Sequence, residues 1–143
     1  MELSIDFGTT FSTLGRLSTE PLAPWLAFVA IQEQARVISR IRSTKQSPEG
    51  QPWSPWRPST QRQREKKGNS SRGLLYDEGL LLANIISNAN LHEVEIGVSS
   101  EVPYAPWLQN GTPHMAARPF VGWGSDSLAN LEASAAAFLS RIS

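Results

Sequence analysis

The sequence predicts an α+β protein, an antiparallel sheet of about four strands packed by two helices. Three observations predict it: period-2 alternation at the start and in the second half of the chain, a helical period over about residues 24–42, and a second helical period at the end. The order strand, helix, long loop, strands, helix is typical of α+β proteins. A chain of 143 residues, 40% of them hydrophobic, suffices for one domain, so we expect a single domain over residues 1–143.

Hydrophobic periodicity predicts the first two elements. Leu3, Ile5 and Phe7 alternate with polar residues, which predicts a short half-buried strand. Over about residues 24–42 the apolar residues recur every three or four positions, which predicts a helix with Pro24 in its first turn. The expected buried face of this helix consists of Trp25, Phe28, Ile31, Ala35, Ile38 and Ile41.

Residues 43–73 predict an extended, basic, Pro-rich loop or arm, because they hold four prolines, three glycines and no sustained period. Structureless excursions of about 30 residues inside a compact domain are uncommon and are usually functional. The segment contains Trp53 and Trp56 but few other apolar residues to bury them. Aromatic anchors concentrate at interface centres, so we favour an intersubunit role for both rings over packing on their own domain.

The second half of the chain predicts strands followed by a helix. Residues 80–87 begin as a helical turn and continue as a strand, and the alternation of residues 93–98 completes a hairpin. Residues 104–109 predict a short helical turn, and residues 118–123 a third or fourth strand. The last helix has Asp126 near its positive end and an expected buried face of Leu128, Leu131, Ala135, Phe138 and Ile142.

The charge is unevenly distributed although the formal net charge is zero. Residues 36–72 carry ten of the thirteen Lys and Arg residues and only two acids. Three interpretations stay open: contact with a phosphate backbone, contact with an acidic neighbouring subunit, or a solvated loop. The basic residues that we expect to face DNA or a partner are Arg57, Arg62, Arg64, Lys66, Lys67 and Arg72.

The absence of cysteine excludes disulfides, thiolate zinc sites and cysteine nucleophiles. The start of the chain shows no signal peptide, and its apolar stretches are too short to span a membrane, so we expect a soluble protein assembled in the cytoplasm. His92 and His114 show no spacing typical of a metal site or a catalytic triad. We therefore expect no enzyme activity, no metal and no cofactor.

One motif favours a different class of function. Residues 5–13 (IDFGTTFST) resemble the first phosphate-binding hairpin of the actin and heat-shock chaperone ATPase superfamily. That fold requires two lobes, a second phosphate loop and an adenosine motif, which this chain does not supply. Nucleotide binding is therefore kept as a disfavoured alternative.

An ordered series of short motifs runs through most of the chain. After the Arg-containing helix come GQPW (residues 50–53), a basic stretch, GLLYDEGLL (73–81), a strand ending at Gly97, PYA (103–105), QNG (109–111) and ARPFVG (117–122). This order resembles the Mu-like phage virion morphogenesis family over about residues 31–142. Three positions depart from its pattern: Glu78 replaces Thr or Ser, Trp107-Leu108 replaces Ile-His, and residues 81–83 lack the usual Arg.

The resemblance implies a non-enzymatic structural protein at the neck of a tailed bacteriophage virion. It implies a ring, expected to be a hexamer, that ends the tail tube or joins it to the head connector as a tail terminator or tail completion protein. The expected partners are copies of itself and neighbouring neck, tail tube or sheath proteins, with possible DNA contact in the channel and no membrane. A head-side adaptor or stopper beneath the portal is the alternative.

Ring closure repeats one heterologous contact, so each subunit needs two different surface patches. Arg118 and Phe120 flank Pro119, which favours an edge strand suited to a subunit contact; the alternative is that Phe120 is core and Arg118 solvated. Tyr104 and Trp107 are three residues apart and share one face of a turn. The expected subunit-interface residues are Trp53, Trp56, Tyr104, Trp107, Arg118 and Phe120.

Overall fold

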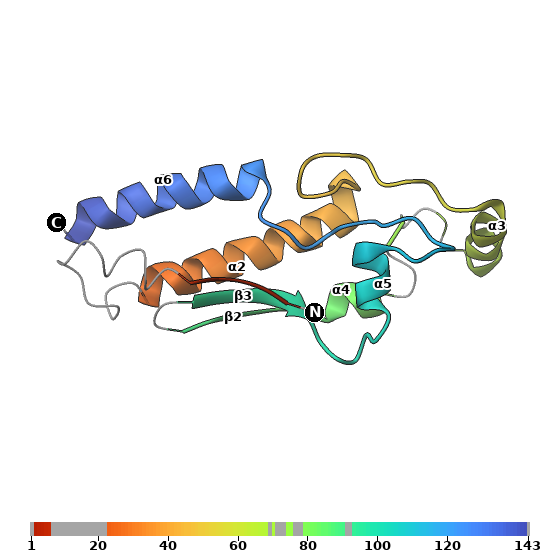
Figure 1. Cartoon of the computed structure of the whole chain (residues 1–143), viewed down its shortest axis with the longest axis horizontal. Coiled ribbons are helices and arrows are strands. Elements are labelled where there is room, and N and C mark those ends of the chain that lie inside the picture. The colour runs from red at the N-terminus through yellow and green to blue at the C-terminus, as the bar shows by residue number, and fades with distance from the viewer. Residues whose placement is uncertain are drawn as a thin grey trace.

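The computed structural model describes residues 2–6, 23–68, 70, 74–75, 79–90 and 93–142. It is an elongated molecule built on two long helices and a small sheet (Figure 1). None of the helices in these ranges is both long and apolar enough to cross a membrane. The elements are β1 (Glu2–Asp6), α2 (Ala23–Ser39), the π-helical segment η2 (Arg40–Thr44), α3 (Pro58–Lys67), α4 (Leu80–Ala83), β2 (Ile85–Ala89), β3 (Glu93–Val98), α5 (Ala105–Asn110) and α6 (Ser125–Ile142).

The sheet has the strand order β1-β3-β2, and both pairs are antiparallel. The predicted hairpin is confirmed: Ile85 pairs with Val98 and Ala89 with Val94. The helical turn expected before it is α4. Val94, Ile96 and Val98 are buried, as the alternation predicted. The mixed α+β class is therefore confirmed.

The expectation of about four strands is wrong for the described residues, which form three. Residues 118–123 do not join the sheet. Their backbone is satisfied in other ways: the Gln109 side chain accepts hydrogen bonds from the amides of Phe120 (3.0 Å) and Val121 (3.1 Å) and donates one to the Val121 carbonyl (2.8 Å). The Arg118 amide donates to the carbonyl of Leu108 at 2.8 Å. Residues 118–123 therefore do not need a neighbouring strand to satisfy these backbone groups.

The helices and sheet form three layers. Helix α2 packs on β2 and β3, and α6 packs on α2 from the side away from the sheet (Figure 1). The expectation that both long helices pack against the sheet is therefore wrong, because α2 separates α6 from it. The indole of Trp25 stacks on Phe138 of α6, with ring centroids 6.0 Å apart, and its Nε1 donates to Ser134 Oγ at 2.9 Å.

The predicted helix over residues 24–42 is confirmed as α2 and the start of η2. Half of its predicted buried face is correct, since Trp25 and Ile41 are buried and Ile38 packs against the core, and the other half is wrong. Phe28 and Ile31 are 47% and 66% exposed, and Ala35 is exposed. Nearly every residue in the first turns is apolar, so periodicity there does not select one face. The buried residues of α2 are Trp25, Leu26, Val29, Ala30, Glu33 and Val37.

The C-terminal helix is confirmed as α6, and most of its predicted face is correct. Leu131, Ala135 and Phe138 pack against the hydrophobic core. Leu128 is exposed instead, because it lies in the first turn, where Ser127 faces inward. The serine is held there by a polar partner on α2.

The extended arm predicted over residues 43–73 contains a helix. Pro58 occupies the first turn of α3, Gly68 caps its end with φ 77°, and the residues between are good helix formers. The absence of apolar periodicity, which favoured a loop, shows instead that α3 packs little of its surface on the core. Figure 1 shows α3 at the end of the molecule opposite the C-terminus.

Candidate subunit interface

The arm is fixed to the body before α3 begins. Trp53 is 6% exposed, and its Nε1 donates to the Pro119 carbonyl at 2.8 Å. The Arg118 guanidinium reaches back, with Nε donating to the Ser54 carbonyl at 2.9 Å and Nη2 to the Pro55 carbonyl at 3.0 Å. Burial lowers the pKa of Arg118. The two segments therefore hold each other in extended conformation, and the direction in which the arm leaves the body is set.

A tight turn just before Trp53 packs against the segment that leads into α6. Gln46 bridges Pro52, and the Ser47 amide donates to the Gln51 carbonyl at 2.8 Å. Pro48 of this turn lies so close to Gly124 that an added Cβ there would stand 1.8 Å from the Pro48 oxygen. Glycine is therefore required at position 124.

A polar cluster joins α2, residues 120–122 and the start of α6; we call it the polar junction (Glu33, Arg36, Arg40, Asp126 and Ser127). Glu33, Arg40 and Ser127 are buried, whereas Asp126 lies at the surface. Arg40 donates to the carbonyls of Phe120 (3.0 Å) and Gly122 (3.2 Å) and to Ser127 Oγ (3.3 Å). The Ser127 hydroxyl donates to Glu33 at 3.0 Å. Burial lowers the pKa of Arg40, against the opposing charges of Asp126 and Glu33.

The base of α3 is held by one stacked pair. The Arg64 guanidinium carbon lies 4.6 Å from the centroid of the Trp56 ring, and Trp56 Nε1 donates to the Leu74 carbonyl at 3.1 Å. Arg64 also donates to that carbonyl at 3.5 Å. Arg64 is buried and Trp56 half-buried. The pair stabilises α3 on the body and leaves the rest of the helix surface open.

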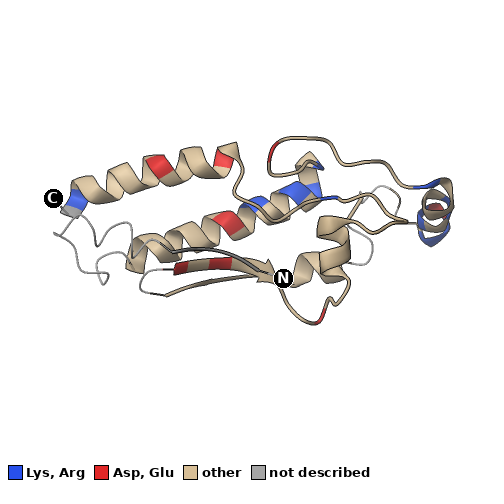
Figure 2. Cartoon of the chain, in the orientation of Figure 1, with Lys and Arg blue, Asp and Glu red and all other residues tan. Residues whose placement is uncertain are grey.

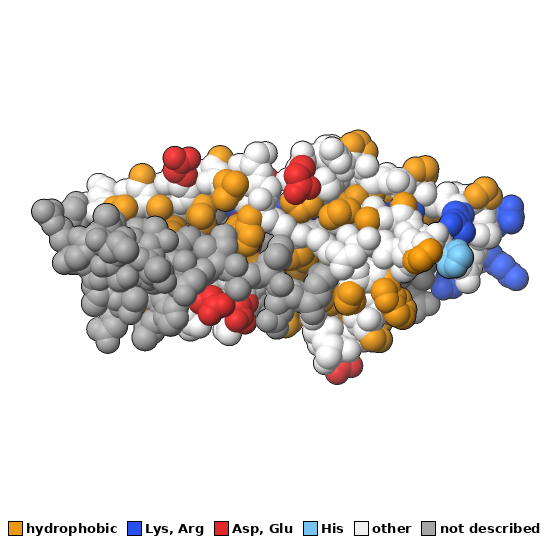
Figure 3. All heavy atoms as spheres, in the orientation of Figure 1, with side chains coloured by type: hydrophobic (Ala, Val, Ile, Leu, Met, Phe, Trp, Pro, Cys, Tyr) orange, Lys and Arg blue, Asp and Glu red, His pale blue; other side chains and the backbone are white. Residues whose placement is uncertain are grey.

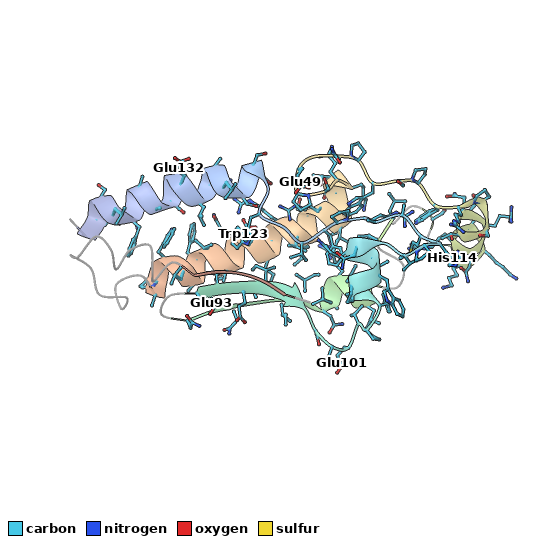
Figure 4. The ribbon with its side chains drawn as sticks, viewed as in Figure 1. Glu49, Glu93, Glu101, His114, Trp123 and Glu132 are labelled. Atoms are coloured by element: carbon cyan, nitrogen blue, oxygen red, sulfur yellow. The ribbon has the colours of Figure 1, made fainter. Side chains whose placement is uncertain are left out.

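The other basic side chains of the arm face outward. Arg57, Arg62, Lys66 and Lys67 are exposed, while the acids lie mainly along the sheet and α6 (Figure 2). Figure 3 shows the basic side chains gathered at the α3 end of the molecule, where Figure 4 also places His114. The predicted basic set is thus divided: Arg64 is an internal support, and Arg72 lies outside the described residues.

Two of the predicted interface aromatics lie on the surface of α5 and its start. Trp107 is 59% exposed, and Tyr104 is exposed beside it. Leu80 of α4 is exposed as well. Tyr104 and Leu80 border a cavity of about 320 Å³ that Arg64 and Leu108 also line. We call Leu80, Tyr104 and Trp107 the aromatic patch.

Of the other predicted interface residues, three lie inside the subunit, and Trp56 is half-buried against Arg64, so an intersubunit role for Trp56 stays a prediction. Trp53 and Arg118 are buried, and Phe120 is fully buried. The preference for an intersubunit role of Trp53 over packing on its own domain is therefore wrong. The edge strand expected at Arg118 and Phe120 is also absent from the described residues. Phe120 is core, the alternative considered above, and Arg118 is buried rather than solvated.

Sequence reasoning missed the polar residues that position these segments. The sequence pattern does not indicate that Glu33 and Arg40 are buried, because charged residues are rarely fully buried. Gln109 was visible as a family motif, but its bonds to residues 120 and 121 were not predictable from spacing. The alternative nucleotide motif falls on residues 5–13, of which 7–13 lie outside the described residues, as does His92.

Comparison with known proteins identifies the family. The model of the phage virion morphogenesis family matches residues 9–140. This chain belongs to the phage virion morphogenesis family. No curated protein and no solved structure gives a significant match. Membership makes it a protein of phage virion assembly, and the structure shows what its motif residues do: Trp53, Gln109 and Arg118 hold the arm and the segment before α6 together.

Proposed function

We propose that this protein is a ring-forming structural subunit at the neck of a tailed phage, a tail terminator or tail completion protein that joins the tail tube to the head connector. Its family supports a role in virion assembly. The proposal places it in the virion, in a sixfold ring with neighbouring neck, tail tube or sheath proteins as partners. The role includes no catalytic step and no cofactor.

One observation carries the proposal: an exposed basic helix projects from the body on an arm whose base is held rigid. Trp53, Arg118 and the Trp56–Arg64 pair fix that base, so the helix is presented in one orientation. A surface fixed in advance loses little conformational entropy on binding. A subunit that repeats a head-to-tail contact needs such a projecting surface, together with a different receiving surface.

The basic face of α3 fits two partners, the phosphates of DNA in the channel or an acidic protein surface. Exposed Arg57, Arg62, Lys66 and Lys67 suit either. We favour the protein surface, because α6 of the same chain carries two exposed acids, Asp126 and Glu132 (Figure 2). Steep salt dependence of DNA binding by the purified protein would favour the channel instead.

The proposal is tested by locating the protein in intact particles. Density at the tail-proximal end of the neck, with several copies around the axis, is the expected result. Density directly beneath the portal would identify the head-side adaptor or stopper instead. A single copy off the axis, or a protein that is lost from the finished particle, would contradict the ring.

A further inference from the structure

An apolar groove lies between the start of α2 and the end of α6. Its volume is about 550 Å³, within the range of about 300–1,000 Å³ usual for binding pockets. Phe28 borders the groove with nearly half of its surface exposed, and Ile31 follows one turn later, more exposed still. The lining residues are Pro24, Trp25, Phe28, Ser134, Ala137, Phe138 and Arg141.

The groove and the aromatic patch lie in different halves of the molecule. The start of α2 and the end of α6 lie at one end, and α4 and α5 lie in the half that carries α3 (Figure 1). Trp107 projects from α5, whereas the groove is concave and lined by rings. The two surfaces differ in shape, as the two sides of a heterologous contact must.

Charged residues also differ between the two halves of the molecule. Beyond the aromatic patch, toward the tip of the molecule, comes basic α3 (Figure 2). On the receiving side, exposed Glu132 lies two residues before the first groove residue of α6, Ser134, toward the middle of the molecule (Figure 4). If the aromatic patch of one copy meets the groove of the next with the long axes in the same direction, α3 of the first extends toward the side of the groove that carries this acid.

We propose that the α2–α6 groove receives Trp107 of a second copy of this chain, with α3 of that copy on the side of Glu132. The inference rests on the proposed ring and specifies its repeating contact. Aromatic anchors at the centre and complementary charges at the rim match the usual anatomy of an interface. Arg141 at the groove rim supplies a guanidinium able to stack on the incoming indole.

The contact is tested by mixing two full-length variants, each defective in one surface. Trp107→Glu removes the projecting side and keeps the groove, while Phe28→Glu does the reverse. Sedimentation should show each variant as a monomer, with self-association at least about thirtyfold weaker than that of the unchanged protein. An equimolar mixture should form a dimer and nothing larger, since only one intact pairing remains.

Ile86→Ser is the matched control, because Ile86 is exposed to the same degree as Phe28 and lies in neither surface. It should assemble as the unchanged protein does. If both Glu variants assembled like the unchanged protein, the inferred contact would be refuted, but the proposed ring would stand. Loss of thermal stability in Phe28→Glu with undiminished assembly would show that the groove is filled from within its own chain, and would also overturn it.

Cysteine cross-linking in assembled particles separates the two proposals. The chain has no cysteine, so Phe28→Cys and Trp107→Cys together give a clean readout with a short bifunctional maleimide. A ladder of multimers from the double variant, and none from either single variant, is expected. Ring density without a ladder would refute only this contact, whereas the absence of a ring would refute the proposed function as well.

Discussion

Arg40 joins three segments that are far apart in the sequence. Its guanidinium binds the carbonyls of Phe120 and Gly122 and the hydroxyl of Ser127, and it lies 3.7 Å from Asp126. A buried cation is tolerated only when its donors are satisfied in this way, because the cost of removing the charge from water is high. The position of the segment before α6 thus depends on one side chain of the α2–η2 helix.

Replacing Arg40 by Met should lower the free energy of unfolding by about 3 kcal/mol, because two carbonyls and the Ser127 hydroxyl lose a buried partner. Urea denaturation measures the change. Arg42→Met is the control, since Arg42 is exposed in the same helical segment, and should change stability by less than about 0.5 kcal/mol. Equal effects of the two substitutions would contradict the role of the polar junction.

Gly111 ends α5 with φ 77°, and an added Cβ would stand 2.8 Å from the Ala117 amide nitrogen. Gly50 also has a positive φ, of 84°, but nothing lies near its Cβ position. Gly50→Ala should cost about 1 kcal/mol from backbone strain alone, and Gly111→Ala about 3 kcal/mol from strain and collision together. Thermal unfolding measures the stability lost in each variant, and the difference between the two losses is the contribution of the collision. Equal losses would show that the collision contributes nothing.

At the scale of elements, α3 forms because of its local sequence and is held on the body through Arg64, which contacts Trp56 and the Leu74 carbonyl. Its favourable first-turn proline, helix-forming residues and terminal glycine account for the helix. Its place beside the body depends on Arg64 over Trp56. An element held in this way can present its remaining charges without unfolding the core.

Arg64→Ala should therefore lower stability by about 1–2 kcal/mol, because both the stacked cation and its packed stem are lost. Arg62→Ala removes the same charge from an exposed position two residues earlier and should change stability by less than about 0.5 kcal/mol. Chemical denaturation followed by tryptophan fluorescence reports both. If the two substitutions proved equivalent, Arg64 would not support the arm.

At the scale of the whole molecule, the charges are separated along the long axis. Basic α3 is at one end, and the half-buried acids of β3 and the exposed acids of α6 are distributed toward the other (Figure 2). Such a distribution makes little difference to the fold of one subunit, because exposed charges contribute little to stability. It orients subunits that approach one another and disfavours the wrong pairings.

Reversing the charge of Arg62, Lys66 and Lys67 to Glu should leave the thermal stability of the subunit nearly unchanged and reduce the yield of infectious particles at least tenfold. Arg64 is left out because it is buried against Trp56. Genetic complementation measures the yield, and circular dichroism verifies the fold. Normal infectivity would leave only the interpretation of α3 as a solvated surface.

The sequence by itself determined where most of the elements form, α3 and the unformed strand over residues 118–123 being the exceptions. Period-2 alternation placed the hairpin of β2 and β3, helical periods placed α2 and α6, and short-range residue types placed α5. These features depend on neighbours a few residues away, so they can be read from the chain. The ordered motifs also identified the family, which the match over residues 9–140 confirms.

Only the tertiary structure decided which polar side chains face inward. Glu33 and Arg40 of the α2–η2 helix are buried because Ser127 and the backbone of residues 120–122 supply their hydrogen bonds from the far end of the chain. Gln109 likewise replaces the strand expected over residues 118–123. A pattern that scores hydrophobicity assigns such positions to solvent, since the bonds that make their burial possible come from residues distant in sequence.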